Sequence, residues 1–386
     1  MAEMRSGRME ELLRNFALIT ENSYQRLAEW KDHAKGNVIG CLPMYVPEEI
    51  IDAAGILPIT ILVEDNNITL ADYYLQPHLC SLVRAKFDLA LRGKLDFLDG
   101  IVFPDLCDLT QQIPDIWSLH SSVPFKYSLC LARGNLKLPS RKHYLVQQFT
   151  HFKVSLERHF SLRITDERLR QSIITYNTHR TLLQRLYQIR RSNPSLFHAG
   201  DLVMVVAASM FMPKEEHNKL LLELITQAEA IAPVTDNRPR LVLSQLCDRP
   251  KKGVIDLFDQ VGAVVADDDL FTGTRYFFKL VDDTLNPIES LVDRYVNGVP
   301  CPTKSDSNHD WGDFLVNMVK NANADGIVIF LVRFCEPLGF DYPYLKKKLS
   351  EARVPNMLLE TEVGVEGHLE QIRTKVQAFI EMLKGV

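Results

Sequence analysis

The chain has 386 residues, more than one hydrophobic core usually supports, so we expect two domains or slightly more. Its content of 46% hydrophobic and 24% charged residues is ordinary for a globular protein. The net charge of -5 and the pI near 6.1 give no attraction to polyanions, so neither nucleic acid nor a membrane surface is an expected partner.

The N-terminal residues 1–34 carry acids throughout and have no uninterrupted apolar core. They are predicted to form an amphipathic helix, not a signal peptide or a membrane span. The longest apolar stretch elsewhere, residues 202–212, is too short to cross a bilayer. Seven cysteines without an export signal indicate a reducing compartment, so we expect a cytoplasmic protein with mostly free thiols.

Two segments of the chain repeat the same order of elements. Residues 37–65 and 240–269 each read as a buried strand, a loop containing proline, a helix, and a second apolar strand followed by acids. Further along, DGIVFPDLCD at 99–108 and DGIVIFLVRFCE at 325–336 each combine an Asp-Gly strand with a cysteine. Alternating strands and helices favour parallel sheets covered on both faces. We therefore predict two similar α/β domains, each an open doubly wound sheet.

The middle of the chain differs from both repeats, because it has helical spacing and lacks β-branched runs. It is predicted to be a helical insert or linker. The expected organisation is a helical segment at 1–34, a first α/β domain at 35–139, the helical insert at 140–235 and a second α/β domain at 236–386.

Three cysteines occupy positions that predict exposure to a cleft. Ligand sites in open α/β sheets lie beyond the carboxyl ends of the strands, where Cys107 and Cys335 each follow an Asp-Gly strand. Cys80 lies at the first turn of a strongly helical segment, where the helix dipole and free amides are expected to lower its pKa and favour the thiolate. The other four cysteines are expected to be small buried hydrophobic residues: Cys41, Cys130, Cys247 and Cys301.

Three thiolates from two domains, without the C-x-x-C spacing of a structural zinc site, indicate a soft-metal centre across an interface. Iron–sulfur clusters normally take four cysteines, so three would leave one iron open to a sulfide, a water or a substrate oxygen. The alternative is that each is an ordinary buried thiol. The sequence contains no nucleotide-binding loop, zinc-protease helix or nucleophile elbow.

Other polar groups are given mostly structural interpretations. The acids Asp267, Asp268 and Asp269 are expected to form a solvated turn at a strand end, with a cation site as the alternative. Tyr45 and Glu48 follow the first strand and are candidates for catalytic contact with substrate, with helix N-terminal roles as the alternative. Solvated or capping roles are expected for five histidines: His78, His120, His217, His309 and His368.

Several motifs of the chain form a recognisable combination: YVPEEIIDAAGILP, PHLCSLVRAKFDLALRGKLDFLDGIVFPDLCD, DDDLFTGTR, PCPTK, DGIVIFLVRFCEP followed by FDYPYLKKKL, and IRTKVQAFIEML. Taken together, they resemble the benzoyl-CoA reductase and 2-hydroxyacyl-CoA dehydratase family. The likeness runs from about residue 35 to the C-terminus. The chain size, PCPTK and FCEPLGFDYPYLK most resemble the smaller, gamma-type cluster-bearing subunit of ATP-dependent benzoyl-CoA reductase.

The resemblance implies a 4Fe-4S cluster on Cys80, Cys107 and Cys335. It also implies a homologous second cluster-bearing subunit, an ATP-hydrolysing activator with its own 4Fe-4S cluster, and a CoA thioester between protein and cluster. In the reductase branch, ferredoxin is the electron donor and the ring of benzoyl-CoA, an aromatic CoA thioester, is reduced to a cyclic diene by a radical route. In the dehydratase branch, one electron forms a ketyl radical that expels the hydroxyl. We expect the reductase, with a 2-hydroxyacyl-CoA dehydratase as the alternative.

Two departures from the family pattern bear on this choice. Where the family often shows G-Q-L-R-T-R, this chain has GHLEQIRTK from Gly367 onward, and Leu270 stands where relatives can carry a further cysteine. Two non-catalytic alternatives are a repeat-built binding protein with structural cysteines and a cluster-free scaffold subunit. The absence of an export signal argues against the first.

Overall fold

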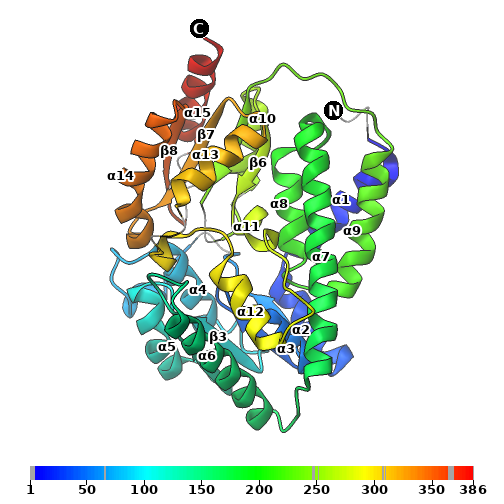
Figure 1. Cartoon of the computed structure of the whole chain (residues 1–386), viewed down its shortest axis with the longest axis vertical. Helices are drawn as coiled ribbons and strands as arrows, with labels where there is room; N and C mark the ends of the chain where they lie inside the picture. Colours follow the sequence, from blue (N-terminus) through cyan, green and yellow to red (C-terminus); the bar gives the residue numbers. More distant parts are fainter. Residues whose placement is uncertain are drawn as a thin grey trace.

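The computed structural model describes residues 5–64, 67–245, 248–250, 252–306, 308, 310–363 and 369–385. It contains two four-stranded parallel sheets, with strand orders β2-β1-β3-β4 and β6-β5-β7-β8. The first sheet lies in the lower part of Figure 1 and the second in the upper part. The prediction of two similar α/β units with a helical segment between them in the sequence is confirmed.

The first sheet is central to the lower half of the molecule. Every residue of its two inner strands is buried, as expected for parallel strands covered on both faces. The strands are β1 (Val38–Cys41), β2 (Leu57–Thr60), β3 (Gly100–Pro104) and β4 (Phe125–Leu129). The helices that connect them are α3 (Glu48–Ala53), α4 (Ser81–Leu91) and α5 (Asp108–His120), with a short 3-10 helix η2 (Ala71–Tyr73).

The second sheet has separate apolar clusters on its two faces and is therefore doubly wound. One cluster includes Phe258 and Phe379, and the other includes Leu315 and Leu345. The strands are β5 (Arg240–Ser244), β6 (Val264–Asp269), β7 (Gly326–Val332) and β8 (Asn356–Thr361). The helices of this unit are α10 (Lys252–Gln260), α13 (Trp311–Asn321), α14 (Glu336–Glu351) and α15 (Leu369–Lys384).

The repeated Asp-Gly pair fixes the register of the inner strands. The Asp99 carboxylate accepts a hydrogen bond from the Val38 amide at 2.8 Å, and the Asp325 carboxylate accepts one from the Arg240 amide at 2.7 Å. The glycine that follows has no room for a side chain. A Cβ on Gly100 or on Gly326 would lie 2.9 Å from a phenylalanine ring. The motif therefore places the start of β3 against β1, and the start of β7 against β5.

A group of helices packs beside the two sheets. The N-terminal segment forms two helices, α1 (Gly7–Thr20) and α2 (Ser23–Ala34), and α1 packs against α8 and α9 (Figure 1). The middle helices are α6 (Pro139–His159), α7 (Asp166–Ser192), α8 (Ala199–Ala208) and α9 (Lys214–Glu229), with a 3-10 turn η3 (Pro194–Leu196). Among the described residues, no helix is both long enough and apolar enough to cross a membrane.

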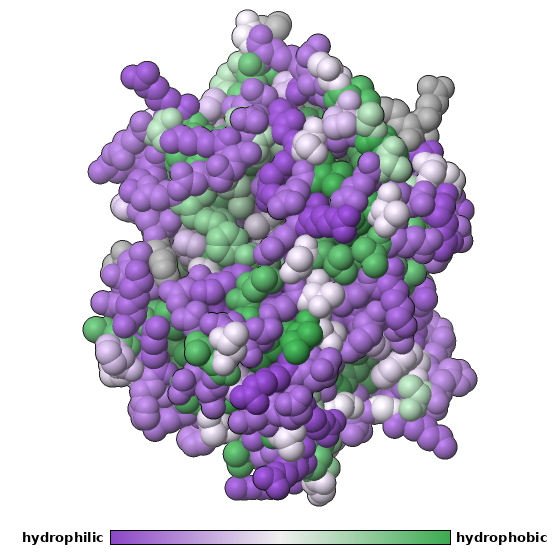
Figure 2. Space-filling model, turned by 45° about the vertical axis from the view of Figure 1, so that its right-hand side comes forward, coloured by the Kyte–Doolittle hydropathy of each residue, from purple (hydrophilic) through white to green (hydrophobic). Residues whose placement is uncertain are grey.

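The chain crosses from the second sheet to the first between residues 271 and 301. Leu291 and Val296 in this stretch belong to the same core cluster as the residues of β1 and β3. The stretch and its continuation contain α11 (Thr274–Phe277), α12 (Pro287–Val296) and the 3-10 turn η4 (Pro302–Lys304). The DDDLFTGTR and PCPTK motifs therefore join the two halves. On the face shown in Figure 2, the surface is hollowed between the upper and lower lobes, and apolar side chains gather in the hollow.

Candidate metal centre

Each of the three proposed cysteine ligands directly precedes a helix. Cys80 is the N-cap residue of α4, Cys107 that of α5 and Cys335 that of α14. Cys107 follows β3 and Cys335 follows β7, as the repeat predicts. A helix N-terminus carries unpaired amides and the positive end of the helix dipole, so all three positions favour negative charge on sulfur.

The three cysteines line one cavity of about 610 Å³. It lies where the carboxyl ends of the inner strands of both sheets meet, since the loops that follow β1, β3, β5 and β7 all contribute residues to its wall. The wall is mainly apolar, and its aliphatic and aromatic members include Leu79, Leu82, Val83, Leu109, Phe330, Val332 and Leu338. The structure therefore brings together two cysteines of the first repeat and one of the second.

Thr110 holds the turn that presents Cys107. Its hydroxyl oxygen accepts hydrogen bonds from the amides of Leu106 and Cys107, both at 2.9 Å. The same oxygen lies 3.6 Å from the Cys107 sulfur. A single threonine at the third position of α5 thus satisfies two free amides and fixes the position of the thiol.

The turn before Cys335 differs from the turn before Cys107, because it contains a residue with an unusual backbone conformation. Phe334 adopts a left-handed backbone conformation with φ of 63°, which is uncommon for an aromatic residue. The Cys335 amide then donates to the Val332 carbonyl at 3.0 Å, and Pro337 lies in the first turn of α14. Such strain persists where the surrounding structure requires it, frequently at functional sites.

The pKa of the Cys80 thiol differs from the sequence prediction. Burial raises it, although the backbone amides of Val83 and Leu82 and the Lys86 ammonium act in the opposite direction. Burial likewise raises the pKa of the Cys335 thiol to about 12. The expected lowering at Cys80 is therefore wrong for the free thiol, because the sequence reveals the helix amides but not the apolar wall. A coordinated metal reverses this balance, since it deprotonates the thiol that binds it.

The donor set fits an iron–sulfur cluster better than a single ion. Among the residues that the structure describes, no three His, Cys, Asp or Glu side chains are grouped closely enough to hold one metal ion. A four-iron cluster does not require such a group, because each thiolate binds a different iron. Three thiols on a cavity with apolar walls match the soft ligands and the exclusion of water that such clusters need.

Of the remaining cysteines, the three that the structure describes do not line this cavity. Cys41 and Cys301 are buried, and Cys130 is partly buried. The Cys301 sulfur lies 3.2 Å from the Thr303 hydroxyl. Cys247 lies outside the described residues.

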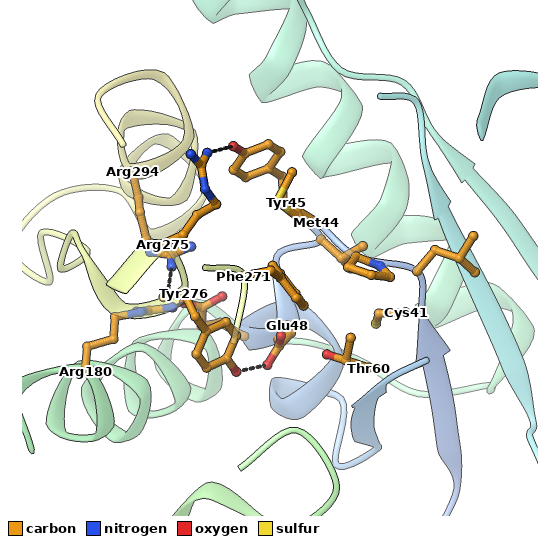
Figure 3. Close-up of a pocket in the computed structure, with 14 residues that line it drawn as sticks. Cys41, Met44, Tyr45, Glu48, Thr60, Arg180, Phe271, Arg275, Tyr276 and Arg294 are labelled. Atoms are coloured by element: carbon orange, nitrogen blue, oxygen red, sulfur yellow. Dashed lines mark hydrogen bonds and ion pairs between the residues drawn. The ribbon is translucent and has the colours of Figure 1, made fainter. Parts of the chain in front are cut away.

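Tyr45 and Glu48 line a second, much smaller cavity of about 40 Å³, shown in Figure 3. The Arg275 guanidinium donates to the Tyr45 hydroxyl at 3.4 Å, and the Tyr276 hydroxyl donates to the Glu48 carboxylate at 2.8 Å. Neither residue reaches the three-cysteine cavity. Leu42 lines both cavities and lies between the two groups.

The small cavity is surrounded by buried charges. Burial acts to raise the pKa of Glu49, but the guanidiniums of Arg180 and Arg294 outweigh it and hold that pKa below its usual value. Burial lowers the pKa of Arg294 to about 10 and that of the nearby Lys304 to about 7. The Lys304 ammonium lies 4.7 Å from the centre of the Tyr45 ring and donates to the Tyr295 carbonyl at 2.7 Å.

The acidic triplet is buried and ion-paired, which corrects the expectation of a solvated turn. Asp267, Asp268 and Asp269 are each at most 2% exposed. Arg191 pairs with the first at 2.6 Å, Arg190 with the second at 2.8 Å, and Arg275 with the third at 2.7 Å. Two of these arginines come from α7, which the local sequence around the acids does not reveal.

The histidine expectations are met in part. His78 and His120 are exposed. His217 is fully buried, its Nε2 lies 2.9 Å from the Val205 carbonyl, and burial lowers its pKa to about 3. Its predicted solvated role is therefore wrong, because α9 turns this face toward α1 and α8. His309 and His368 lie outside the described residues.

Two cavity-lining polar residues were missed in the sequence. Lys86 of α4 forms a fully buried ion pair with Asp248, which follows β5 and also accepts a hydrogen bond from the Val63 amide at 3.1 Å. Gln245 directly follows β5 and faces the three-cysteine cavity. Gln245 comes directly after an apolar strand, which is the signal that would have identified it. Lys86 stands between Arg84 and Asp88 in the sequence, so its segment gives no comparable signal.

A family model described as 2-hydroxyglutaryl-CoA dehydratase, D-component, matches residues 43–383. The chain belongs to this family. It is 26% identical to the (R)-phenyllactyl-CoA dehydratase beta subunit of Clostridium sporogenes, over 97% of this chain and 99% of that protein. It is 27% identical to a benzoyl-CoA reductase subunit of Thauera aromatica, over 95% and 96%, and to the beta subunit of lactoyl-CoA dehydratase of Anaerotignum propionicum, over 98% and 100%.

As a member of this family, the chain is an enzyme subunit of the dehydratase and reductase type. The three relatives are all named as subunits, so partner subunits are implied. Identity does not separate the two branches, because the dehydratase subunits and the reductase subunit are equally similar to this chain.

Proposed function

We propose that this chain is the cluster-bearing subunit of a heteromeric radical enzyme acting on a CoA thioester, and that Cys80, Cys107 and Cys335 hold a 4Fe-4S cluster. The carrying observation is that three helix N-cap cysteines, drawn from both sheets, line one apolar cavity. The bound cluster would supply electrons one at a time at low potential.

The protein contributes exclusion of water and a positive electrostatic environment. The apolar wall keeps the site dry, and the helix N-termini stabilise negative charge on the sulfurs. Lys86 also lines this wall, where its ammonium is paired with the buried Asp248 carboxylate. Tyr45 and Glu48 lie on the far side of Leu42 from the cysteines. We propose that their only role is to hold the charged groups of the small cavity in position.

Anaerobic purification, followed by cluster reconstitution and analysis of iron and acid-labile sulfide, tests this assignment. We expect about four irons per chain for the wild type and a marked loss for Cys335→Ser, which removes a thiolate ligand. The matched control is Cys130→Ser, which should keep its iron because Cys130 lies outside the cavity. A colourless, iron-free wild type would favour the scaffold subunit.

For the reaction we propose reduction of an aromatic acyl-CoA, with benzoyl-CoA as substrate and ferredoxin as donor, on the likeness of PCPTK and FCEPLGFDYPYLK to the reductase subunit. Dehydration of a 2-hydroxyacyl-CoA is the second candidate, favoured by the matching similarity to the phenyllactyl and lactoyl enzymes.

The ratio of ATP hydrolysed to product formed separates the two reactions. The assay combines this chain, its homologous partner, the ATP-hydrolysing activator and reduced ferredoxin. A reductase consumes ATP in proportion to the electrons transferred, because those electrons remain in the product. A dehydratase recovers its electron in each turnover and needs ATP only to start. Catalytic ATP use with release of water would reject the reductase and leave the cluster assignment intact.

A further inference from the structure

Gln245 occupies a distinctive position in the three-cysteine cavity. It is the first residue after β5, an inner strand of the second sheet, and it lines the cavity together with Cys80, Cys107 and Cys335. Its backbone has a φ of 60°, in the left-handed region that non-glycine residues rarely adopt. Its backbone N–H donates to the Asp269 carbonyl at 3.3 Å, which anchors the backbone of Gln245 at the cavity wall.

The side-chain amide of Gln245 lacks a partner where one is expected. The residue is 5% exposed, and among the described residues no group accepts a hydrogen bond from its Nε2. Leaving a buried donor unsatisfied costs about 1–3 kcal/mol. A strained backbone and an unsatisfied donor at the same residue require an explanation, and an acceptor within the cavity provides one.

The repeat shows that the fold itself does not demand this amide. Ile39 pairs with Gly100 in the first sheet as Leu241 pairs with Gly326 in the second. Gln245 lies four residues beyond Leu241, and the residue four beyond Ile39 is Pro43. Pro43 lines the same cavity and has no side-chain donor. The two halves thus present different chemistry to one space, and only the second half presents a donor at this position.

We propose that Gln245 donates a hydrogen bond from Nε2 to a sulfur of the iron–sulfur cluster held by the three cysteines, and thereby raises the reduction potential of that cluster. This proposal rests on the proposed function. Hydrogen bonds to cluster or cysteine sulfurs stabilise the more negative, reduced state and are a main determinant of cluster potential. Gln245 is accordingly a positioning and tuning residue, not a ligand.

The test uses the full chain, with cluster reconstituted anaerobically, and an EPR-monitored redox titration of Gln245→Leu and Gln245→Glu. Leucine removes the donor and keeps a similar volume, while glutamate keeps the shape and introduces negative charge. We expect both variants to retain iron and sulfide. The midpoint potential of the leucine variant should be lower by about 59 mV, which corresponds to a tenfold change in the one-electron equilibrium constant. The midpoint potential of the glutamate variant should be lower still. Gln377→Leu on α15, at an exposed glutamine that bonds Glu381, is the matched control and should not shift.

An unchanged midpoint potential in both cluster-loaded variants would overturn the proposal and leave the cluster assignment standing. Loss of iron from Gln245→Leu, with iron retained by the control, would overturn it as well, because the residue would then be needed to hold the cluster. Absence of iron from the wild type would instead reject the proposed function. Urea unfolding of the cluster-free chains checks folding, and the leucine variant should be no less stable than the wild type, since it removes an unsatisfied buried donor.

Discussion

Arg275 joins the end of β6 to the loop after β1: its guanidinium lies 2.7 Å from the Asp269 carboxylate and 3.4 Å from the Tyr45 hydroxyl. It also donates to the Pro300 carbonyl at 3.2 Å. One buried side chain thus connects both sheets to the segment that crosses between them. This junction is electrostatic: Arg275 and Asp269 are buried, and Tyr45 and Pro300 are partly buried.

Arg275→Leu should strongly destabilise the protein, because Asp269 is fully buried and would lose its paired charge. Removing one partner of a buried ion pair costs about 3–5 kcal/mol, measured as the free energy of unfolding in urea. Arg185→Leu breaks the exposed pair with Glu229 and serves as the control, with a much smaller effect expected. Equal losses in the two variants would contradict the argument.

Gly273→Ala should also destabilise the chain. A Cβ at this position would lie 1.7 Å from an Asp268 carboxylate oxygen, and that oxygen accepts a hydrogen bond from the Thr274 amide at 3.2 Å. Relief would require movement of a fully buried acid, so we expect a loss above about 2 kcal/mol in urea unfolding. Gly253→Ala in α10 meets no atom closer than 3.6 Å and should stabilise the helix by up to about 1 kcal/mol. The argument is supported if the two substitutions change the free energy of unfolding in opposite directions.

Lys86→Met should weaken the contact between the two halves. The variant leaves Asp248 buried without its ammonium partner, at an expected cost of about 3–5 kcal/mol in the free energy of unfolding. The double variant Lys86→Met with Asp248→Leu should recover most of this loss, because an apolar pair of similar volume carries no desolvation cost. A double variant no more stable than the single one would show that the hydrogen bond from Val63 to Asp248 is the dominant contact.

The stability of the protein should fall on acidification partly through two buried histidines. Burial lowers the pKa of His217 to about 3 and that of His179 well below its usual value, whereas both titrate near 6.5 when unfolded. Between these values the unfolded chain binds protons that the folded chain does not, so the free energy of unfolding decreases as pH falls below about 6.5. Each such proton contributes about 1.4 kcal/mol per pH unit.

His217→Gln should therefore make the dependence of stability on pH shallower between pH 6.5 and 5 by about one proton. The measurement is a series of urea unfolding curves across this range. His120→Gln replaces an exposed histidine, removes no buried imidazole and serves as the control. The prediction fails if the two variants have the same slope.

The sequence was most informative where local pattern and topology agree. The Asp-Gly strands can be recognised in the sequence because both residues are structurally required in each half. The aspartate carboxylate accepts a hydrogen bond from the neighbouring strand, and the glycine must fit against a phenylalanine ring. Parallel strands end at one edge, so the meeting of Cys107 and Cys335 at one cavity follows from the repeat.

The predictions that were wrong concern properties that depend on residues distant in the sequence. Nothing near Asp268 in the sequence indicates that Arg190 of α7 pairs with it, because 78 residues separate them. The pKa of Cys80 was misjudged for the same reason, since the wall that desolvates it includes residues of the second half. Long-range burial leaves no local signature, whereas strand ends and helix starts do.

The division of the three cysteines between the two halves has a consequence for biosynthesis. Cys335 is the last of the three cysteines to be translated. Helix α1 can pack only after its contact partners α8 and α9 have been synthesised. The cavity therefore does not exist on the nascent chain until both sheets have formed. Any group held by all three thiols must be inserted after synthesis has passed Cys335, into a chain that has docked its two halves. Maturation then depends on access through that docked cavity, and not on capture by an emerging segment.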